Sequence, residues 1–106
     1  MNIAKLMQQA QQMQFKLQEM QEKLKDLTVI GESGGGLVKI VMSCAGETKS
    51  VTIDPALIRA EDKETLEDLI VAALNNAHEA KEERIKNETQ AMMEKLGLPK
   101  DAKLPF

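Results

Sequence analysis

The first 27 residues carry an apolar stripe that constrains the fold more than any other stretch of the chain. Apolar side chains recur alternately three and four residues apart, at Ile3, Leu6, Ala10, Met13, Leu17, Met20, Leu24 and Leu27. This heptad spacing predicts a helix that packs lengthwise on another helix. A helix of about 27 residues is roughly 40 Å long, whereas a compact chain of this size is about 26–30 Å across. We therefore expect the helix to extend beyond the body of the protein as an arm.

The positions that flank this stripe do not favour a zipper between two parallel copies of the helix. They are neutral or basic and comprise Met7, Gln9, Gln14, Lys16, Gln21 and Lys23. Parallel zippers pair opposite charges at these positions. The stripe is thus predicted to pack on a different helix of the same assembly. Phe15 lies opposite the stripe and is interpreted either as a scattered surface residue or as a contact site.

Composition excludes several classes of function. The two aromatic residues, Phe15 and Phe106, are too few for a platform that stacks single-stranded nucleic acid. The net charge of −3 gives no overall attraction for a polyanion, so a nucleic-acid partner would have to be bound by local charge. The single cysteine, Cys44, excludes an internal disulfide and a cysteine-based zinc site and is typical of a reducing cytosol.

No continuous apolar run predicts a signal peptide or a membrane span. The first helix is rich in glutamine and has too few cations on its polar face for an interfacial membrane helix. We therefore expect a soluble, cytoplasmic protein with no membrane partner.

Residues 28–61 are predicted to form three short antiparallel strands and a helical turn. The strands begin at Thr28, Leu37 and Thr48, and a hairpin turn at residues 44–47 joins the second to the third. Alternation places Val38, Ile40 and Met42 on one face of the second strand, and Lys49, Val51 and Ile53 on one face of the third. The glycine-rich segment 31–36 lacks the Gly-Lys-Ser/Thr ending of a phosphate loop and is interpreted as a bulged or tight connection between strands. Such a small sheet has two open edges, which invite a second copy.

A second long helix is predicted from Lys63 to about Lys95, with Asp62 as its cap and Gly97 as its stop. Pro55 to Ile58 forms a short helical turn before it. The first half of this second long helix has a broad apolar stripe suited to covering a sheet, at Leu66, Leu69, Ile70 and Leu74. Beyond Ala80 the stripe becomes polar, so the distal half is predicted to leave the core as a second arm. Residues 97–106 are expected to be an irregular tail.

The chain shows no constellation of acid, base and nucleophile, so an enzyme is not predicted. His78 is the only histidine and is interpreted as structural. It has no second histidine or cysteine beside it for a transition metal. The acidic residues Glu79, Glu82 and Glu83 alternate with cations and are typical of a solvated helix face. We expect no cofactor, no metal and no small-molecule substrate.

Three motifs in one order resemble the YbaB/EbfC family of bacterial nucleoid-associated proteins, over nearly the whole chain. They are Ser33-Gly34-Gly35-Gly36-Leu37-Val38-Lys39, Val51-Thr52-Ile53-Asp54-Pro55 and Leu66-Glu67-Asp68-Leu69-Ile70-Val71-Ala72-Ala73-Leu74-Asn75-Asn76-Ala77. The resemblance implies a homodimer whose long helices project from a central body like tweezers. It also implies binding of double-stranded DNA without enzymatic activity, a change in DNA conformation, and roles in nucleoid organisation and gene regulation.

The resemblance further implies that the first helix and the last long helix contact DNA. Carried onto this chain, it makes five cations candidates for phosphate contact: Lys5, Lys16, Lys23, Lys81 and Arg84. Acids outnumber bases on the second of these helices, so we expect modest affinity that falls steeply with salt.

The sequence as a whole predicts one α+β domain with two layers over residues 1–106. Its parts are a helical arm (1–27), a small sheet and turn (28–61), a long helix (62–96) and a tail (97–106). The residues assigned to the core or dimer interface are Val38, Ile40, Val51, Ile53, Leu66, Leu69, Ile70 and Leu74. The alternative to DNA binding is a dimeric adaptor whose arms bind a partner protein's helix through Met7, Phe15, Ile85 and Met92.

Overall fold

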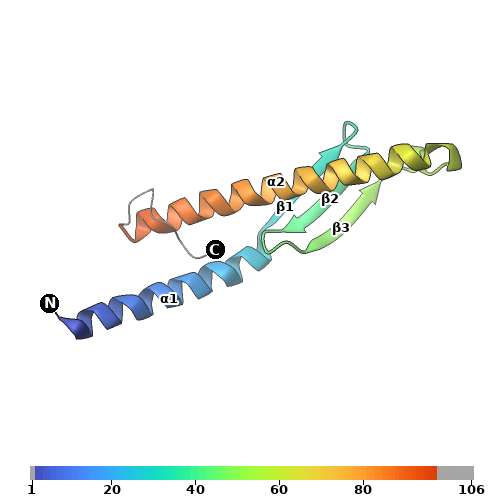
Figure 1. Ribbon diagram of the computed structural model, residues 1–106. Helices are drawn as coiled ribbons and strands as arrows, with labels where there is room; N and C mark the ends of the chain where they lie inside the picture. The colour runs from blue at the N-terminus through green and yellow to red at the C-terminus, as the bar shows by residue number, and fades with distance from the viewer. Residues whose placement is uncertain (1, 98–106) are drawn as a thin grey trace.

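The computed structural model describes residues 2–97 and contains two long helices joined through a small sheet (Figure 1). The elements are α1 (Ile3–Asp26), β1 (Thr28–Ser33), β2 (Val38–Ser43), β3 (Thr48–Ile53), two 3₁₀ turns (Pro55–Leu57 and Ala60–Asp62) and α2 (Lys63–Lys95). The predicted order of helix, three strands, turn and helix is confirmed. Met1 and the predicted tail from residue 98 onward lie outside the described residues.

The helix ends follow local chemistry, with one difference from the sequence-based expectation. Asn2 caps α1, because its side-chain oxygen accepts hydrogen bonds from the backbone N–H groups of Ala4 and Lys5. Asp62 occupies the N-cap position of α2 as expected, but its side chain makes no capping hydrogen bond. Its backbone (φ −101°, ψ 9°) belongs to the preceding 3₁₀ turn and is not the extended backbone of a capping residue. Gly97 has a φ of +70°, which ends α2 in the left-handed region that favours glycine.

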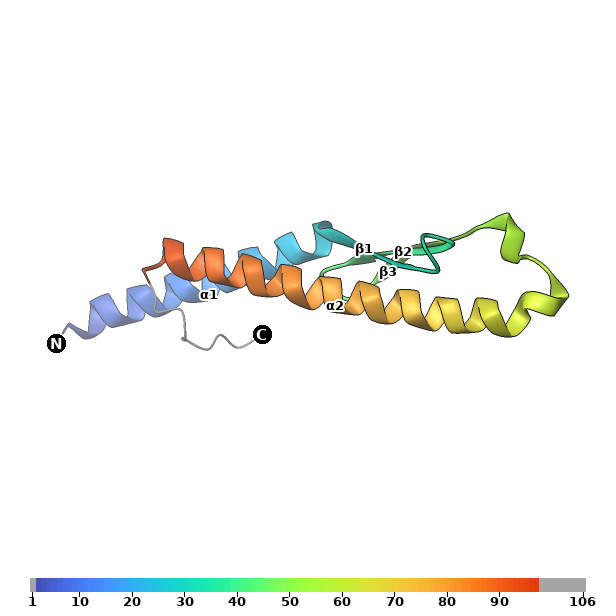
Figure 2. The ribbon, with the colours of Figure 1, turned by 90° about the horizontal axis from the view of Figure 1, so that it is seen from above.

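The three strands form an antiparallel sheet in the order β1-β2-β3. Val38, Ile40 and Met42 of the central strand are buried on one face, and α2 packs on that face over β1 and β2. The sheet and α2 thus make two layers, which Figure 2 shows from above. The predicted core residues found in this cluster are Val38, Ile40, Ile53, Leu66, Leu69, Ile70 and Leu74.

Val51 was predicted with the core and dimer residues and is 48% exposed. It pairs with Ile40 and therefore shares the face that α2 covers. It is outside the core of this chain because the cover provided by α2 falls mainly on β1 and β2.

Only part of the glycine-rich segment is a connection between strands. Gly34, Gly35 and Gly36 all have positive φ and form the turn, as expected for a tight connection. Gly31 differs because it belongs to β1, where it pairs with Ile40. A Cβ atom at Gly31 would lie 2.6 Å from the Ala77 Cα atom of α2. The missing side chain is what lets the helix approach the sheet this closely.

The molecule is elongated, with principal extents of 71 × 21 × 17 Å and a radius of gyration of 19.3 Å. A compact chain of this length would have a radius of gyration of about 13 Å. The additional length comes from α1 and the distal half of α2, which leave the sheet on the same side in both views (Figures 1 and 2). The expectation that α1 extends beyond the body is confirmed.

Candidate functional site

The two projecting helices contact each other beside the sheet. Met20 and Leu24 of α1 are buried with Cys44, and Ile85 and Met92 of α2 pack against this cluster. The apolar stripe of α1 is thus covered by a different helix of the same chain in its C-terminal half. Nearer the N-terminus Ile3 and Leu6 are exposed.

This contact corrects the interpretation of the polar stripe on α2. The distal half of α2 was expected to leave the core as a second arm because this stripe loses its apolar character after Ala80. Glu88, on that stripe, instead meets Lys23 of α1 at 2.7 Å. The distal half of α2 thus leaves the sheet, as expected, but it contacts α1 along this stripe.

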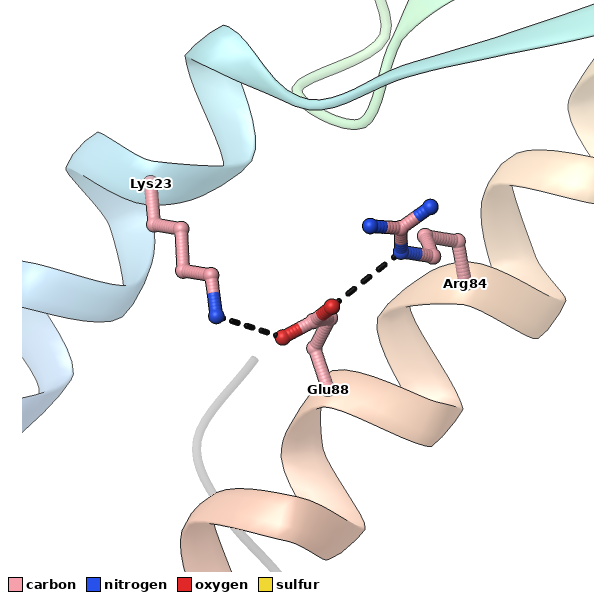
Figure 3. Close-up of polar contacts among 3 residues, drawn as sticks. All are labelled: Lys23, Arg84 and Glu88. Carbon is pink, nitrogen blue, oxygen red and sulfur yellow. Dashed lines mark hydrogen bonds and ion pairs between the residues drawn. The ribbon is translucent and has the colours of Figure 1, made fainter.

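Glu88 bridges two of the five candidate cations (Figure 3). One carboxylate oxygen accepts a hydrogen bond from Lys23 Nζ at 2.7 Å, and the other accepts one from Arg84 Nε at 3.1 Å. The Glu88 side chain is 17% exposed, whereas both cations are more open to solvent. The three side chains form a charged bridge across the α1–α2 contact.

The bridge changes the acidity of its central residue. Hydrogen bonds from Lys23 and then Arg84 hold the pKa of the Glu88 carboxyl below its ordinary value of 4.5, against a smaller opposing effect of burial. Burial is the main cause that raises the pKa of the Cys44 thiol in the adjacent cluster. Cys44 is 2% exposed and is therefore a protected thiol.

The contribution of the bridge to stability is expected to vanish in acid. A carboxyl whose pKa is lowered by folding stabilises the native state above its unfolded pKa, and loses that effect as the pH falls through the folded pKa. The free energy of unfolding of the wild type should therefore exceed that of Glu88→Gln by up to about 1 kcal/mol at neutral pH. The difference is small because both cations are partly solvated. Thermal unfolding of the two proteins from pH 7 to pH 3 measures this difference. An advantage of wild type that persists unchanged below the folded pKa would contradict the assignment.

The remaining candidate cations differ in accessibility. Lys5 is exposed and makes no ion pair with any residue of the described range 2–97. Lys16 makes only a loose pair with Glu19, at 3.5 Å, between two exposed side chains. Lys81 is 13% exposed and contacts Glu82 at 3.4 Å, and its Nζ lies beside the Gly46 turn. Of these three, Lys5 and Lys16 are the cations that a polyanion reaches most easily.

Three of the lysines lie along one flank of α1. Lys5, Lys16 and Lys23 are separated by 11 and 7 residues, which at 100° per residue places them within about 20° of one another around the helix axis. The line from the first to the third is about 27 Å long. Lys23, at the inner end of the line near the sheet, contacts Glu88, whereas Lys5, at the outer end near the N-terminus, is exposed to solvent. Nothing in the heptad pattern alone marked this line, because the lysines flank the stripe.

Two hollows beside Phe15 of α1 have volumes of about 580 and 560 Å³, whereas the hollow between Met20 of α1 and Met92 of α2 is smaller. It has a volume of about 150 Å³, with Met20, Ala91 and Met92 among its lining residues. Sites for small molecules are typically about 300–1,000 Å³. Within residues 2–97, no group of three or more His, Cys, Asp or Glu side chains is arranged to hold a metal ion. Neither long helix of that range has a stretch apolar enough to cross a membrane.

A model of the YbaB/EbfC DNA-binding family matches residues 1–96. The chain belongs to this family. A solved structure, that of an uncharacterized protein, HP0035 from Helicobacter pylori, is similar to this chain, with a TM-score of 0.74 and 32% sequence identity. The match covers 88% of this chain and 98% of that one. Membership of a nucleoid-associated, DNA-binding family makes the lysine flank of α1 the surface to consider first.

Sequence reasoning missed the role of Glu88 within this YbaB/EbfC chain. Glu88 lies on the polar continuation of the α2 stripe, and Lys23 occupies a basic position that flanks the α1 stripe. Each was treated within its own helix. Their opposite charges were the available signal that the two stripes face each other.

Proposed function

We propose that this YbaB/EbfC protein binds double-stranded DNA as a homodimer and alters the conformation of the duplex. It acts without catalysis, in the cytoplasmic nucleoid, in nucleoid organisation and the regulation of gene expression. The observation that carries this proposal is the line of Lys5, Lys16 and Lys23 along the projecting helix α1, in a chain that belongs to a DNA-binding family.

The lysine line suits contact with the phosphate backbone. Its length of about 27 Å approaches one turn of B-DNA, about 34–36 Å. Lysines bind phosphate as point charges and release condensed counterions, which gives affinity that is independent of base sequence. Contacts of this kind position a protein on the duplex but do not read bases.

The homodimer is supported by apolar surface that this chain leaves uncovered. Val51 faces the helix side of the sheet beyond the cover of α2, and β1 and β3 are open sheet edges. Other large apolar side chains are also exposed, namely Ile3, Leu6, Met7, Ile30, Ile58 and Val71. A second copy would bury such surface and double the number of lysine lines.

Binding is expected to be modest and to weaken steeply with salt. We expect fluorescence anisotropy with a random-sequence duplex to show binding at 50 mM salt that is largely lost at 200 mM, since each phosphate contact adds about −0.9 to the slope of log K against log salt. A scrambled duplex of equal length should bind equally well, because the contacts are to the backbone. Absence of binding at low salt would refute DNA binding, and affinity independent of salt would refute the backbone mechanism.

The adaptor alternative keeps one supporting observation. Met7 and Phe15 are about 60% exposed, and an exposed aromatic side chain suits a protein contact. Ile85 and Met92, the other half of that predicted surface, pack against α1 in this chain. An adaptor is favoured if Phe15→Ser abolishes function in cells while duplex affinity in vitro stays unchanged.

A further inference from the structure

Glu88 pairs with two of the candidate cations, Lys23 and Arg84, across the contact between α1 and α2. Both of its carboxylate oxygens are used, one by Lys23 of α1 and the other by Arg84 of α2. Its side chain is much less exposed than those of its two partners. One carboxylate shared by two cations leaves the three side chains with a net charge of +1, so a phosphate that approaches either cation meets a charge that is partly compensated.

We propose that Glu88 is an internal competitor of DNA phosphate for Lys23 and Arg84, and so sets the affinity of the α1 lysine line for DNA. This inference rests on the proposed function. In the free protein the carboxylate partly compensates the charge at the inner end of the line, where Lys23 lies. When a duplex binds, Lys23 and Arg84 exchange the carboxylate for backbone phosphates. The exchange cancels much of the attraction that these two cations would otherwise supply.

The competition leaves the outer part of the line uncompensated. Lys5 makes no ion pair within residues 2–97, and Lys16 pairs only loosely with an exposed glutamate. First contact with a polyanion therefore falls on the outer part of α1, and contacts at the junction follow only if phosphate displaces Glu88. Exposed ion pairs are weak enough to be exchanged in this way, because water and salt screen them.

The test compares Glu88→Gln with a charge-matched control. Glutamine keeps the volume of the side chain but removes the charge that holds the two cations. Glu83→Gln changes the net charge equally, at an exposed residue of α2 that makes no ion pair within residues 2–97. We expect Glu88→Gln to raise duplex affinity about three- to tenfold at 100 mM salt and to steepen the salt slope by about one to two per chain. Glu83→Gln should change affinity less than twofold.

A second comparison shows whether the increase in duplex affinity depends on Lys23 and Arg84. In a Lys23→Gln, Arg84→Gln background, adding Glu88→Gln should no longer raise affinity, because the groups it would release are absent. An effect of the same size in that background would overturn the proposal. So would an unchanged or lower affinity of Glu88→Gln in the otherwise wild-type protein, which would mean that Glu88 positions the cations and does not compete for them.

Cys44 reports whether α1 stays in place. The thiol is buried in the cluster formed with Met20 and Leu24 of α1, so detachment of α1 would expose it to a thiol reagent. We expect the labelling rate of Cys44 in Glu88→Gln to stay within about twofold of wild type, since the apolar cluster is unchanged. A much faster rate together with higher DNA affinity would overturn the competition, because a detached helix would then be the cause.

The outcomes separate this inference from the proposed function. If wild type binds the duplex and Glu88→Gln binds no better, only the inference fails. If neither protein binds at low salt, DNA binding fails and the inference fails with it. Binding by Glu88→Gln that far exceeds that of wild type would support both.

Discussion

Alanine at position 31 is expected to destabilise the fold by about 3 kcal/mol or more, at the upper end of the cost of overpacking a core. Gly31 lies in β1 directly beneath α2, and an added Cβ would meet the backbone of Ala73 and Ala77. Backbone atoms cannot move aside as a side chain can, so the helix would have to separate from the sheet. For a domain of this size the loss corresponds to a fall in the melting temperature of roughly 12–24 °C. Thermal unfolding followed by circular dichroism measures it.

Two further variants sharpen that test. Gly35→Ala adds the same methyl group where no atom of residues 2–97 lies within 4 Å, so it bears only the strain of its positive φ of +68°, a cost of about 1–2 kcal/mol. Ala77→Gly should not rescue Gly31→Ala, because the clash involves the Ala77 backbone. Equal destabilisation by Gly31→Ala and Gly35→Ala would contradict the close approach of α2 to β1.

Removing the two outer lysines of α1 is expected to have the largest effect on DNA binding. Lys5→Gln together with Lys16→Gln eliminates two phosphate contacts per chain and four per dimer. We expect the affinity for a random duplex to fall at least about tenfold at 50 mM salt and the salt slope to become shallower by about 3 to 4. Anisotropy titrations over a salt series measure both quantities. The fold should be unaffected because both side chains are exposed.

The matched control removes two lysines from the body. Lys49 in β3 and Lys63 at the start of α2 are partly or largely exposed, and each pairs with a nearby glutamate. The double glutamine variant lowers the net charge by the same amount, away from the lysine line. It should retain most of the affinity. An equal loss in both double variants would show that overall charge, and not the lysine line, determines binding.

Periodic patterns made the secondary structure predictable. The apolar spacing of α1 and the run from Lys63 to Lys95 give the two long helices nearly residue for residue. The alternation of Val38 and Ile40 gives the buried face of β2. These features are set by residues close together in the sequence. A strand repeats every 2 residues and a helix every 3.6, so the spacing of apolar residues shows each of them directly.

Features that depend on two distant segments were not predictable in the same way. Gly31 was read as part of a turn because glycine is typical of turns, and its role appears only when α2 is laid across β1. The pairing of the polar stripe of α2 was not predicted, because Lys23, the partner of Glu88, lies 65 residues away in the chain. The burial of Lys81 beside the Gly46 turn has the same origin. The family resemblance supplied the DNA partner, whereas the pairing of Glu88 required the spatial arrangement.

The long sequence separation between α1 and its covering helix has a consequence for synthesis of the chain. Met20 and Leu24 leave the ribosome early, but Ile85 and Met92, which pack against them, are made about 70 residues later. At a rate of about 5–20 residues per second the apolar stripe of the nascent chain stays uncovered for roughly 3 to 14 s. During that interval the stripe is available to a chaperone or to a neighbouring nascent chain. During synthesis, α1 can therefore dock on α2 only after α2 has been made as far as its distal half.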